Sequence, residues 1–225
     1  MCGLAGYLGT PPAGADGRAV LAAMIGALAH RGPDGVGIHL DHGVGMAHAR
    51  LSIIDLATGD QPMSSPDGRV WTVFNGEIFN FVELRARLEA QGHVFRTRSD
   101  TEVIVHLYQR HGDAFVDHLN GQFAIALWDG LRRRLVLARD RLGIRPLFHM
   151  RARGAFWFAS EPAALFAALP GHARLDPLGV AQALALWAPM DPDTAWQDVA
   201  SLPPGHMLVL EADGREAVRR YWDWT

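Results

Sequence analysis

Lysine is absent from this sequence, so all 21 of its basic residues are arginines. Without lysine, neither a phosphate-binding loop of the Gly-Lys-Ser/Thr type nor a Schiff base to a lysine amine can form. Cysteine occurs once, as Cys2, and a single thiol can form neither an internal disulfide nor a thiolate zinc site. The formal net charge of −3 argues against non-specific nucleic-acid binding, because that binding requires clustered positive charge.

Long hydrophobic segments are also absent. The longest apolar runs, such as residues 180–190, fall well short of the roughly 20 residues that a helix needs to cross a bilayer. The first basic residue is Arg18 and no apolar core precedes a cleavage site, so we expect no signal peptide. These absences indicate a cytoplasmic protein that binds neither membrane nor nucleic acid.

What the sequence does contain is enough apolar residues for a substantial core. Hydrophobic residues make up 49% and charged residues 20% of the 225 positions, which is typical of a globular domain. In residues 69–76, Trp71 and Val73 point to one face of a predicted strand, while Val70 and Phe74 point to the other. Strands that are apolar on both faces need cover on both sides, so we expect antiparallel sheets sandwiched between layers in an α+β fold.

The order of elements shows no repeated strand–helix–strand unit. Ser99 and Glu102 have capping-box spacing at the start of one predicted helix. We expect residues 1–190 to form the main domain and residues 191–225 to form a C-terminal extension packed on it. The predicted helices are residues 18–29, 81–91, 99–112 and a pair within 161–188, and the predicted strands are residues 3–9, 36–40, 44–54, 69–76, 94–97, 123–129, 134–140, 147–152, 156–161, 206–211 and 217–223, the last two joined by a hairpin at Asp213-Gly214.

The position of Cys2 suggests a specific chemistry. If Met1 is removed, Cys2 carries a free α-amino group with a reference pKa of about 8, which can accept the proton of its own thiol. Cysteine is small enough that we expect removal of Met1; while Met1 stays attached, the amine belongs to Met1 and the thiol lacks this base. On chemistry alone an alternative is equally good, namely that Cys2 is a small residue incidental to the first strand.

A series of short motifs decides between these alternatives. The motifs are MCGLAG (1–6), HRGPDG (30–35), ARLSIIDLATGDQPM (49–63), FNGEIFN (74–80), SDTEVI (99–104), GQFAIALWD (121–129), ARDRLGIRPLF (138–148), FASE (158–161) and LPPGH (202–206). They follow one another in the order found in the class II, N-terminal-nucleophile glutamine amidotransferases, and the chain most closely resembles the glutaminase domain of glutamine-hydrolysing asparagine synthetases. The resemblance implies a four-layer αββα sandwich of two antiparallel sheets.

This resemblance implies that the protein hydrolyses L-glutamine to glutamate and ammonia. Cys2 is then the nucleophile that forms a γ-glutamyl thioester. The side-chain amide of Asn75 and the backbone N–H of Gly76 are then the donors that stabilise the oxyanion. Taken alone, Asn75-Gly76 is more typical of a tight turn after a strand.

The resemblance also implies a site for the amino-acid end of glutamine. Arg50 matches the residue that binds the α-carboxylate, for which a guanidinium is suited because it can donate two parallel hydrogen bonds. Asp100, supported by Glu77, matches the group that binds the α-ammonium, although any acid is favoured in the first turn of a helix. The other expected substrate-binding residues follow Arg50 in sequence: Leu51, Ser52, Ile53 and Ile54.

Some features receive no catalytic role. Residues 31–35 and 139–147 match family segments, but a helix-ending loop and a loop packed beneath the site explain them at least as well. His39 and His42 resemble a pair of metal ligands, yet no third ligand stands out, so we expect no metal.

The resemblance stops at the glutaminase part of the synthetases. Their pyrophosphate-binding signature, SGG followed shortly by Asp-Ser, does not occur here. We therefore expect no cofactor in this chain, with ATP and Mg confined to an absent synthetase domain, or to a partner protein, that receives the ammonia. Homodimer formation stays open. Two alternatives remain, a non-catalytic docking or regulatory module and an N-terminal-nucleophile amidase for another amide.

Overall fold

The computed structural model describes residues 1–11 and 15–224, and two β-sheets form its centre. Each sheet has six strands within these residues, and every pair of neighbouring strands is antiparallel. Sheet A consists, in spatial order, of β10 (Val199–Ser201), β8 (Phe148–Ala152), β9 (Ala155–Ala159), β1 (Gly3–Leu8), β3 (Val44–Arg50) and β2 (Gly35–Asp41). Sheet B consists, in spatial order, of β12 (Glu216–Arg220), β11 (His206–Glu211), β7 (Arg134–Arg139), β6 (Gly121–Asp129), β5 (Val70–Ile78) and β4 (Met63–Ser64).

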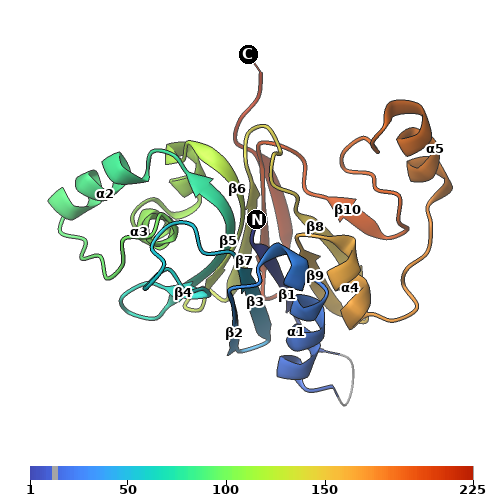
Figure 1. Cartoon of the computed structure of the whole chain (residues 1–225), viewed down its shortest axis with the longest axis horizontal. Coiled ribbons are helices and arrows are strands. Elements are labelled where there is room, and N and C mark those ends of the chain that lie inside the picture. The colour runs from blue at the N-terminus through green and yellow to red at the C-terminus, as the bar shows by residue number, and fades with distance from the viewer. Residues whose placement is uncertain (12–14, 225) are drawn as a thin grey trace.

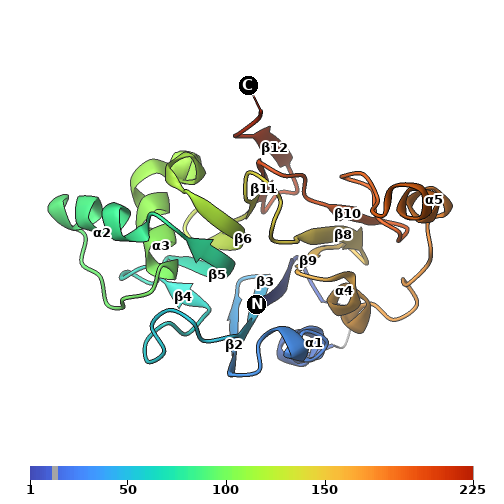
Figure 2. The same cartoon turned by 45° about the horizontal axis from the view of Figure 1, so that its top comes forward.

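Helices cover the outer faces of both sheets (Figure 1 and Figure 2). The described residues also form two 3-10 helices, η1 (Ala29–Arg31) and η2 (Gly112–His118). Within the described residues, no helix is long and apolar enough to cross a membrane. The helices beside sheet B are α2 (Phe81–Ala90) and α3 (Thr101–His111), those beside sheet A are α1 (Gly17–Gly26) and α4 (Pro162–Ala168), and α5 (Pro177–Leu186) lies beyond α4 on the same side.

Three buried apolar clusters lie between the four layers. One joins α2 and α3 to sheet B through residues such as Leu88 and Leu107. The second joins α1 and α4 to sheet A through residues such as Met24 and Leu165. The third lies between the two sheets and includes Leu4, Val44, Met46, Val73, Ala126, Trp128, Leu137, Phe158 and Leu208. The predicted four-layer αββα sandwich of antiparallel sheets is therefore confirmed.

Strand β5 shows why two layers of cover are needed. Val70 and Phe74 belong to the cluster beneath the helices, whereas Val73 belongs to the cluster between the sheets, with Trp71 packed against it. Successive side chains of a strand point to opposite faces, so this alternation buries apolar groups on both sides at once. The prediction that this strand is covered on both faces is confirmed.

Two predicted strand segments have a different structure. The strand expected over 44–54 ends at Arg50, and residues 51–54 form a loop instead. The strand expected over 94–97 is absent, because the backbone N–H groups of Arg96 and Thr97 donate to the carboxylate of Glu102 rather than to a neighbouring strand.

The expected capping box at Ser99 and Glu102 is also wrong. The residue at the N-cap of α3 is Asp100, not Ser99. The Glu102 carboxylate accepts hydrogen bonds from Arg96 and Thr97, which precede the helix, instead of from the N–H of the cap residue. Spacing alone did not reveal that this side chain folds back over the preceding loop.

The C-terminal residues take part in both sheets. β10 pairs with β8 at the edge of sheet A, and β11 lies between β7 and β12 in sheet B. The hairpin predicted at Asp213-Gly214 is present as β11 and β12, while the short strands β4 and β10 had no counterpart in the predicted elements. The division between residues 1–190 and 191–225 stays a prediction.

We expect Phe158→Ala to lower the free energy of unfolding by about 3–5 kcal/mol, because it opens a cavity between the sheets. Phe158 is fully buried in the central cluster, whereas Phe79 is 57% exposed. Phe79→Ala is therefore a matched control that should stay within about 0.5 kcal/mol of the parent protein. Urea denaturation measures both values, and similar losses for the two variants would contradict this assignment of the core.

Candidate active site

One pocket collects nearly all the residues that the sequence predicts for the site. It opens where β1 and β3 of sheet A lie against β5 of sheet B. Of the ten predicted residues, only Ser52 does not line it. The nine that do are Cys2, Arg50, Leu51, Ile53, Ile54, Asn75, Gly76, Glu77 and Asp100. The fold thus brings these residues together, and their individual roles stay predictions.

Cys2 is held by contacts to both its backbone and its thiol. Its sulfur lies 3.4 Å from the backbone nitrogen of Leu51, which donates to it, and 3.5 Å from the carbonyl oxygen of Leu51. Arg31 Nε donates to the Cys2 carbonyl at 3.0 Å, and Arg31 Nη1 is fixed in turn by Glu161 at 2.6 Å.

Asn75 lies within β5 and is almost fully buried. Its side-chain nitrogen Nδ2 has no hydrogen-bond partner among the residues that the structure describes. A buried polar group without a partner is uncommon in proteins and often marks a functional position. An amide N–H2 that lines the pocket with its hydrogens free can serve as a donor to a developing oxyanion.

Gly76 follows Asn75 in the same strand. Both residues pair with β6, Asn75 with Ala124 and Gly76 with Phe123, so the alternative that Asn-Gly forms a tight turn is wrong. A Cβ atom at position 76 would lie 1.9 Å from the carbonyl oxygen of Gln122. Only glycine therefore lets β5 stay paired with β6 at this point of the pocket.

Arg50 ends β3, and its guanidinium is held from one side of the pocket. Nη2 donates to the carbonyl oxygen of Asp55 at 2.6 Å, and Nη1 donates to that of Leu56 at 3.3 Å and to the carboxylate of Asp60 at 2.7 Å. A Cβ atom on Gly59 would come within 2.7 Å of Nη2. The loop after β3 therefore fixes a positive charge in the pocket wall, where it forms an ion pair with the exposed carboxylate of Asp60.

Asp100 supplies a buried carboxylate to the same pocket. It is 4% exposed, and its Oδ2 accepts a hydrogen bond from the backbone N–H of Ile78 at 3.0 Å. Burial raises the pKa of Asp100 to about 6, and the nearby charge of Glu77 adds to the rise. A carboxylate destabilised in this way gains strongly from a cationic partner, which suits the binding of an ammonium group.

The loop of residues 51–54 is fixed by a residue to which the sequence assigned no role. Asp34 donates its backbone N–H to the carbonyl of Arg50 at 2.9 Å, and its Oδ2 accepts from the N–H of Ser52 at 2.8 Å. Asp34 belongs to the motif HRGPDG, which matched the family without a stated function. Ser52 thus contributes by holding the loop in place rather than by lining the pocket.

Gln61 is a second residue that the sequence did not single out. Its Oε1 accepts from the backbone N–H of Phe74 at 2.6 Å, and its Nε2 donates to Thr101 Oγ1 at 3.3 Å. This buried side chain therefore ties β5 to the start of α3, beside Asn75 and Asp100. Its only signal was its place inside the motif of residues 49–63.

No metal centre is formed by His, Cys, Asp and Glu side chains in residues 1–11 and 15–224. His39 and His42, which resemble a ligand pair in sequence, make other contacts. The ring of His39 stacks on Trp71 with centroids 3.9 Å apart, and His42 lies 3.6 Å from the carboxylate of Asp41.

Comparison with protein families adds a decisive observation to this geometry. A family model described as a glutamine amidotransferase domain matches residues 1–222. The chain belongs to this family. Among curated relatives, asparagine synthetase [glutamine-hydrolyzing] 3 of Bacillus subtilis (strain 168) is 36% identical over 226 residues, covering 99% of this chain and 37% of the relative. Asparagine synthetase [glutamine-hydrolyzing] 2 of the same organism is 46% identical over 168 residues, covering 74% of this chain and 22% of the relative.

The match of this amidotransferase domain thus covers 37% of the length of the first relative and 22% of the length of the second. Among solved structures, glutamine phosphoribosylpyrophosphate (PRPP) amidotransferase from B. subtilis, complexed with ADP and GMP, aligns with a TM-score of 0.71 at 22% identity. The alignment covers 98% of this chain and 49% of that chain. This likeness supports the fold of the amidotransferase domain.

We expect the carboxyl carbon of Asp100 to titrate with a midpoint near pH 6, because burial raises its pKa to about 6. Carbon-13 NMR of protein labelled at aspartate carboxyl groups measures the midpoint, and Asp100→Asn assigns the signal by removing it. A midpoint near 4, the ordinary value for aspartate, would contradict the buried position of this carboxylate.

Proposed function

We propose that this amidotransferase domain hydrolyses L-glutamine to glutamate and ammonia through a thioester on Cys2. One observation carries the proposal: a thiol, an unpartnered buried amide, a guanidinium and a buried carboxylate line the same pocket, as Cys2, Asn75, Arg50 and Asp100. Arg50 and Asp100 have the charges to bind the α-carboxylate and α-ammonium of a free amino acid. These two contacts place the side-chain amide of glutamine toward Cys2.

The chemistry follows from these positions. The α-amine of Cys2 takes the thiol proton, and the sulfur attacks the carboxamide carbon of glutamine to form a carbon–sulfur bond. Asn75 Nδ2 and the N–H of Gly76 donate to the resulting oxyanion, where each such donor typically contributes on the order of 10²–10³ in kcat. The carbon–nitrogen bond then breaks, and the amine returns the proton to the leaving ammonia. Water next cleaves the thioester and releases glutamate.

Removal of Met1 is part of this proposal. Met1 lines the pocket beside Cys2, and its sulfur contacts Arg145 Nη1. While Met1 is attached, the free α-amine belongs to Met1 rather than to Cys2. The methionine side chain also lines the pocket that contains the thiol. Cleavage after Met1 therefore creates both the base and the room for glutamine.

The ammonia acceptor belongs to a part of the system outside this domain. The relatives described above are asparagine synthetases, so we propose that an ATP-dependent synthetase domain or partner protein receives the ammonia. ATP and Mg would bind to that domain or partner, and the reaction would take place in the cytoplasm. A docking module without turnover would not require the unpartnered buried amide of Asn75 in the same pocket as the Cys2 thiol. An amidase for an amide without α-groups would not require the charges of Arg50 and Asp100.

Glutamate formation should fall by more than about 10³-fold in Cys2→Ala, because the nucleophile is lost while the fold is kept. An intact mass spectrum should also show that Met1 is absent and that 6-diazo-5-oxo-L-norleucine adds once to the parent protein. The adduct should be blocked by excess glutamine and absent from Cys2→Ala. A protein that lacks Met1 but forms neither adduct nor glutamate would support the docking module instead.

The affinity for glutamine should weaken as the pH falls below about 6. The ammonium binds the ionised form of Asp100, which predominates above the pKa of about 6 and is lost below it. We expect the dissociation constant of glutamine to be nearly constant from pH 7 to 8 and to rise by up to about tenfold per pH unit below 6. Calorimetry on Cys2→Ala measures binding without turnover. A dissociation constant that stays unchanged down to pH 5 would contradict the binding of the ammonium group by Asp100.

A further inference from the structure

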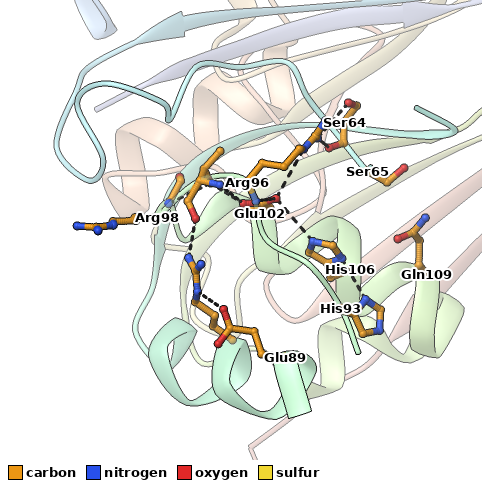
Figure 3. A network of polar contacts seen from close by, with 12 residues as sticks. Ser64, Ser65, Glu89, His93, Arg96, Arg98, Glu102, His106 and Gln109 are labelled. Atoms are coloured by element: carbon orange, nitrogen blue, oxygen red, sulfur yellow. Dashed lines mark hydrogen bonds and ion pairs between the residues drawn. The ribbon is translucent and has the colours of Figure 1, made fainter. Parts of the chain in front are cut away.

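Beside the pocket, a buried carboxylate organises the loop that leads to Asp100. Glu102 lies in the first turn of α3 and is fully buried. Its Oε1 accepts from the backbone N–H of Arg96 at 2.8 Å, and its Oε2 accepts from both the N–H and the Oγ1 hydroxyl of Thr97 at 2.7 Å (Figure 3). Three hydrogen bonds thus converge on one carboxylate from the loop before the helix.

The carboxylate is ionised despite its burial. Burial raises the pKa of Glu102, but the neighbouring His106 ring and the hydrogen bonds from Arg96 and Thr97 outweigh it and lower the pKa to about 2. His106 closes the network on the far side, with Nε2 3.6 Å from Glu102 Oε1 and Nδ1 3.1 Å from Nδ1 of His93 (Figure 3). The carboxylate therefore accepts the hydrogen bonds of the loop in its charged form.

The loop fixed by Glu102 connects both binding groups of the pocket. Thr97 Oγ1 accepts from the N–H of Ser99, which immediately precedes Asp100. The N–H of Arg98 donates to Asp55 Oδ2 at 2.7 Å. The carbonyl of Asp55 accepts in turn from the guanidinium of Arg50 at 2.6 Å. Residues 96–99 are thus linked to both charged groups of the pocket. They are linked to Asp100 through Ser99, and to Arg50 through Asp55.

We infer that Glu102 is a positioning residue for the recognition of the amino-acid end of glutamine, acting through residues 96–99 on Asp100 and Arg50. The inference rests on the proposed function, since it takes glutamine as the substrate. Glu102 is not among the described residues that line the pocket, whereas Cys2 lines it. Its loss should therefore impair the binding of the zwitterion and leave the reactivity of the thiol unchanged.

A purely structural role makes a different prediction. If Glu102 only stabilised the start of α3, its replacement would lower the free energy of unfolding without a selective effect on glutamine. The side chain, however, reaches back five and six residues to the loop rather than to its own helix cap. Misplacement of substrate-binding groups by about 1 Å can reduce catalytic efficiency by about 100-fold.

The test is Glu102→Gln, which keeps the shape of the side chain and one of its two acceptor oxygens. We expect the KM for glutamine to rise by about 10- to 100-fold, with kcat changed by no more than about threefold. Inactivation by 6-diazo-5-oxo-L-norleucine, which carries the same α-groups, should slow by a similar factor. Alkylation of Cys2 by iodoacetamide, which lacks these groups, should proceed at the parent rate.

Tyr108→Phe is the matched control on the same helix. Tyr108 is buried. Its hydroxyl donates to Asp129 Oδ2 at 3.0 Å and accepts from Arg134 Nε at 2.9 Å, so these bonds do not involve residues 96–99. This variant also loses buried polar contacts but should keep the parent KM. An equal KM in Glu102→Gln and Tyr108→Phe would overturn the positioning role, as would equal slowing of the two inactivation reactions.

Thr97→Val provides a second test should Glu102→Gln fail to fold. It removes the hydroxyl between Glu102 and the N–H of Ser99, and we expect a smaller rise in KM in the same direction. A KM equal to that of the parent would count against the inference.

Calorimetry of glutamine with Cys2→Ala and Cys2→Ala/Glu102→Gln separates the two proposals. A parent protein without glutaminase activity would overturn the proposed function, whereas equal dissociation constants would overturn the role of Glu102.

Discussion

The pairing of β1 with β3 in the middle of sheet A is the constraint on which the site depends. A nucleophile that uses its own α-amine must stand at the start of the chain, so the first strand has to begin at the pocket. The register pairs Gly3 with Ala49, which brings Cys2 beside Arg50 and Leu51 across 49 residues of sequence. A slip by one residue would turn every side chain of β1 to the other face, so the apolar pattern of this strand also fixes the thiol.

A single buried hydrogen bond links this register to the second sheet. His48, on β3, is fully buried, and its Nε2 lies 3.0 Å from the carbonyl oxygen of Phe74 on β5. Burial lowers the pKa of His48 to about 4, so the ring is neutral and Nε2 carries the proton that it donates. The bond joins the sheets one residue before Asn75. Asn75, the proposed donor to the oxyanion, is thereby placed relative to the strand that ends in Arg50.

The sequence predicted the layers and the pocket better than it predicted the loops. Apolar alternation identified β5 as covered on both faces, and the motif order identified Cys2, Asn75 and Gly76. Local patterns failed where a distant side chain satisfies the backbone. Residues 94–97 were predicted as a short strand, yet the carboxylate of Glu102 accepts hydrogen bonds from the N–H groups that a strand would offer to its neighbour.

The same limit explains the missed supporting residues. Asp34 and Gln61 act through bonds to backbone groups of the chain 18 and 13 residues away, and no spacing rule predicts such partners. Strands β4 and β10 contain only two and three residues, too few for a period to be detected. Their existence depends on the neighbouring strand, which the sequence pattern does not specify.

The charges of the pocket explain why it is suited to a zwitterion rather than to a simple amide. Arg50 is held mainly by carbonyl oxygens and by the exposed Asp60, and Asp100 is buried with a raised pKa, so each wall is stabilised by an added group of opposite charge. A ligand with both charges satisfies both walls at once. A neutral amide would have to desolvate Asp100 further without a compensating cation. Residues 96–99 are linked to both charged groups, through Ser99 to Asp100 and through Asp55 to Arg50. The ionised Glu102 holds these residues, so it acts on both groups at once.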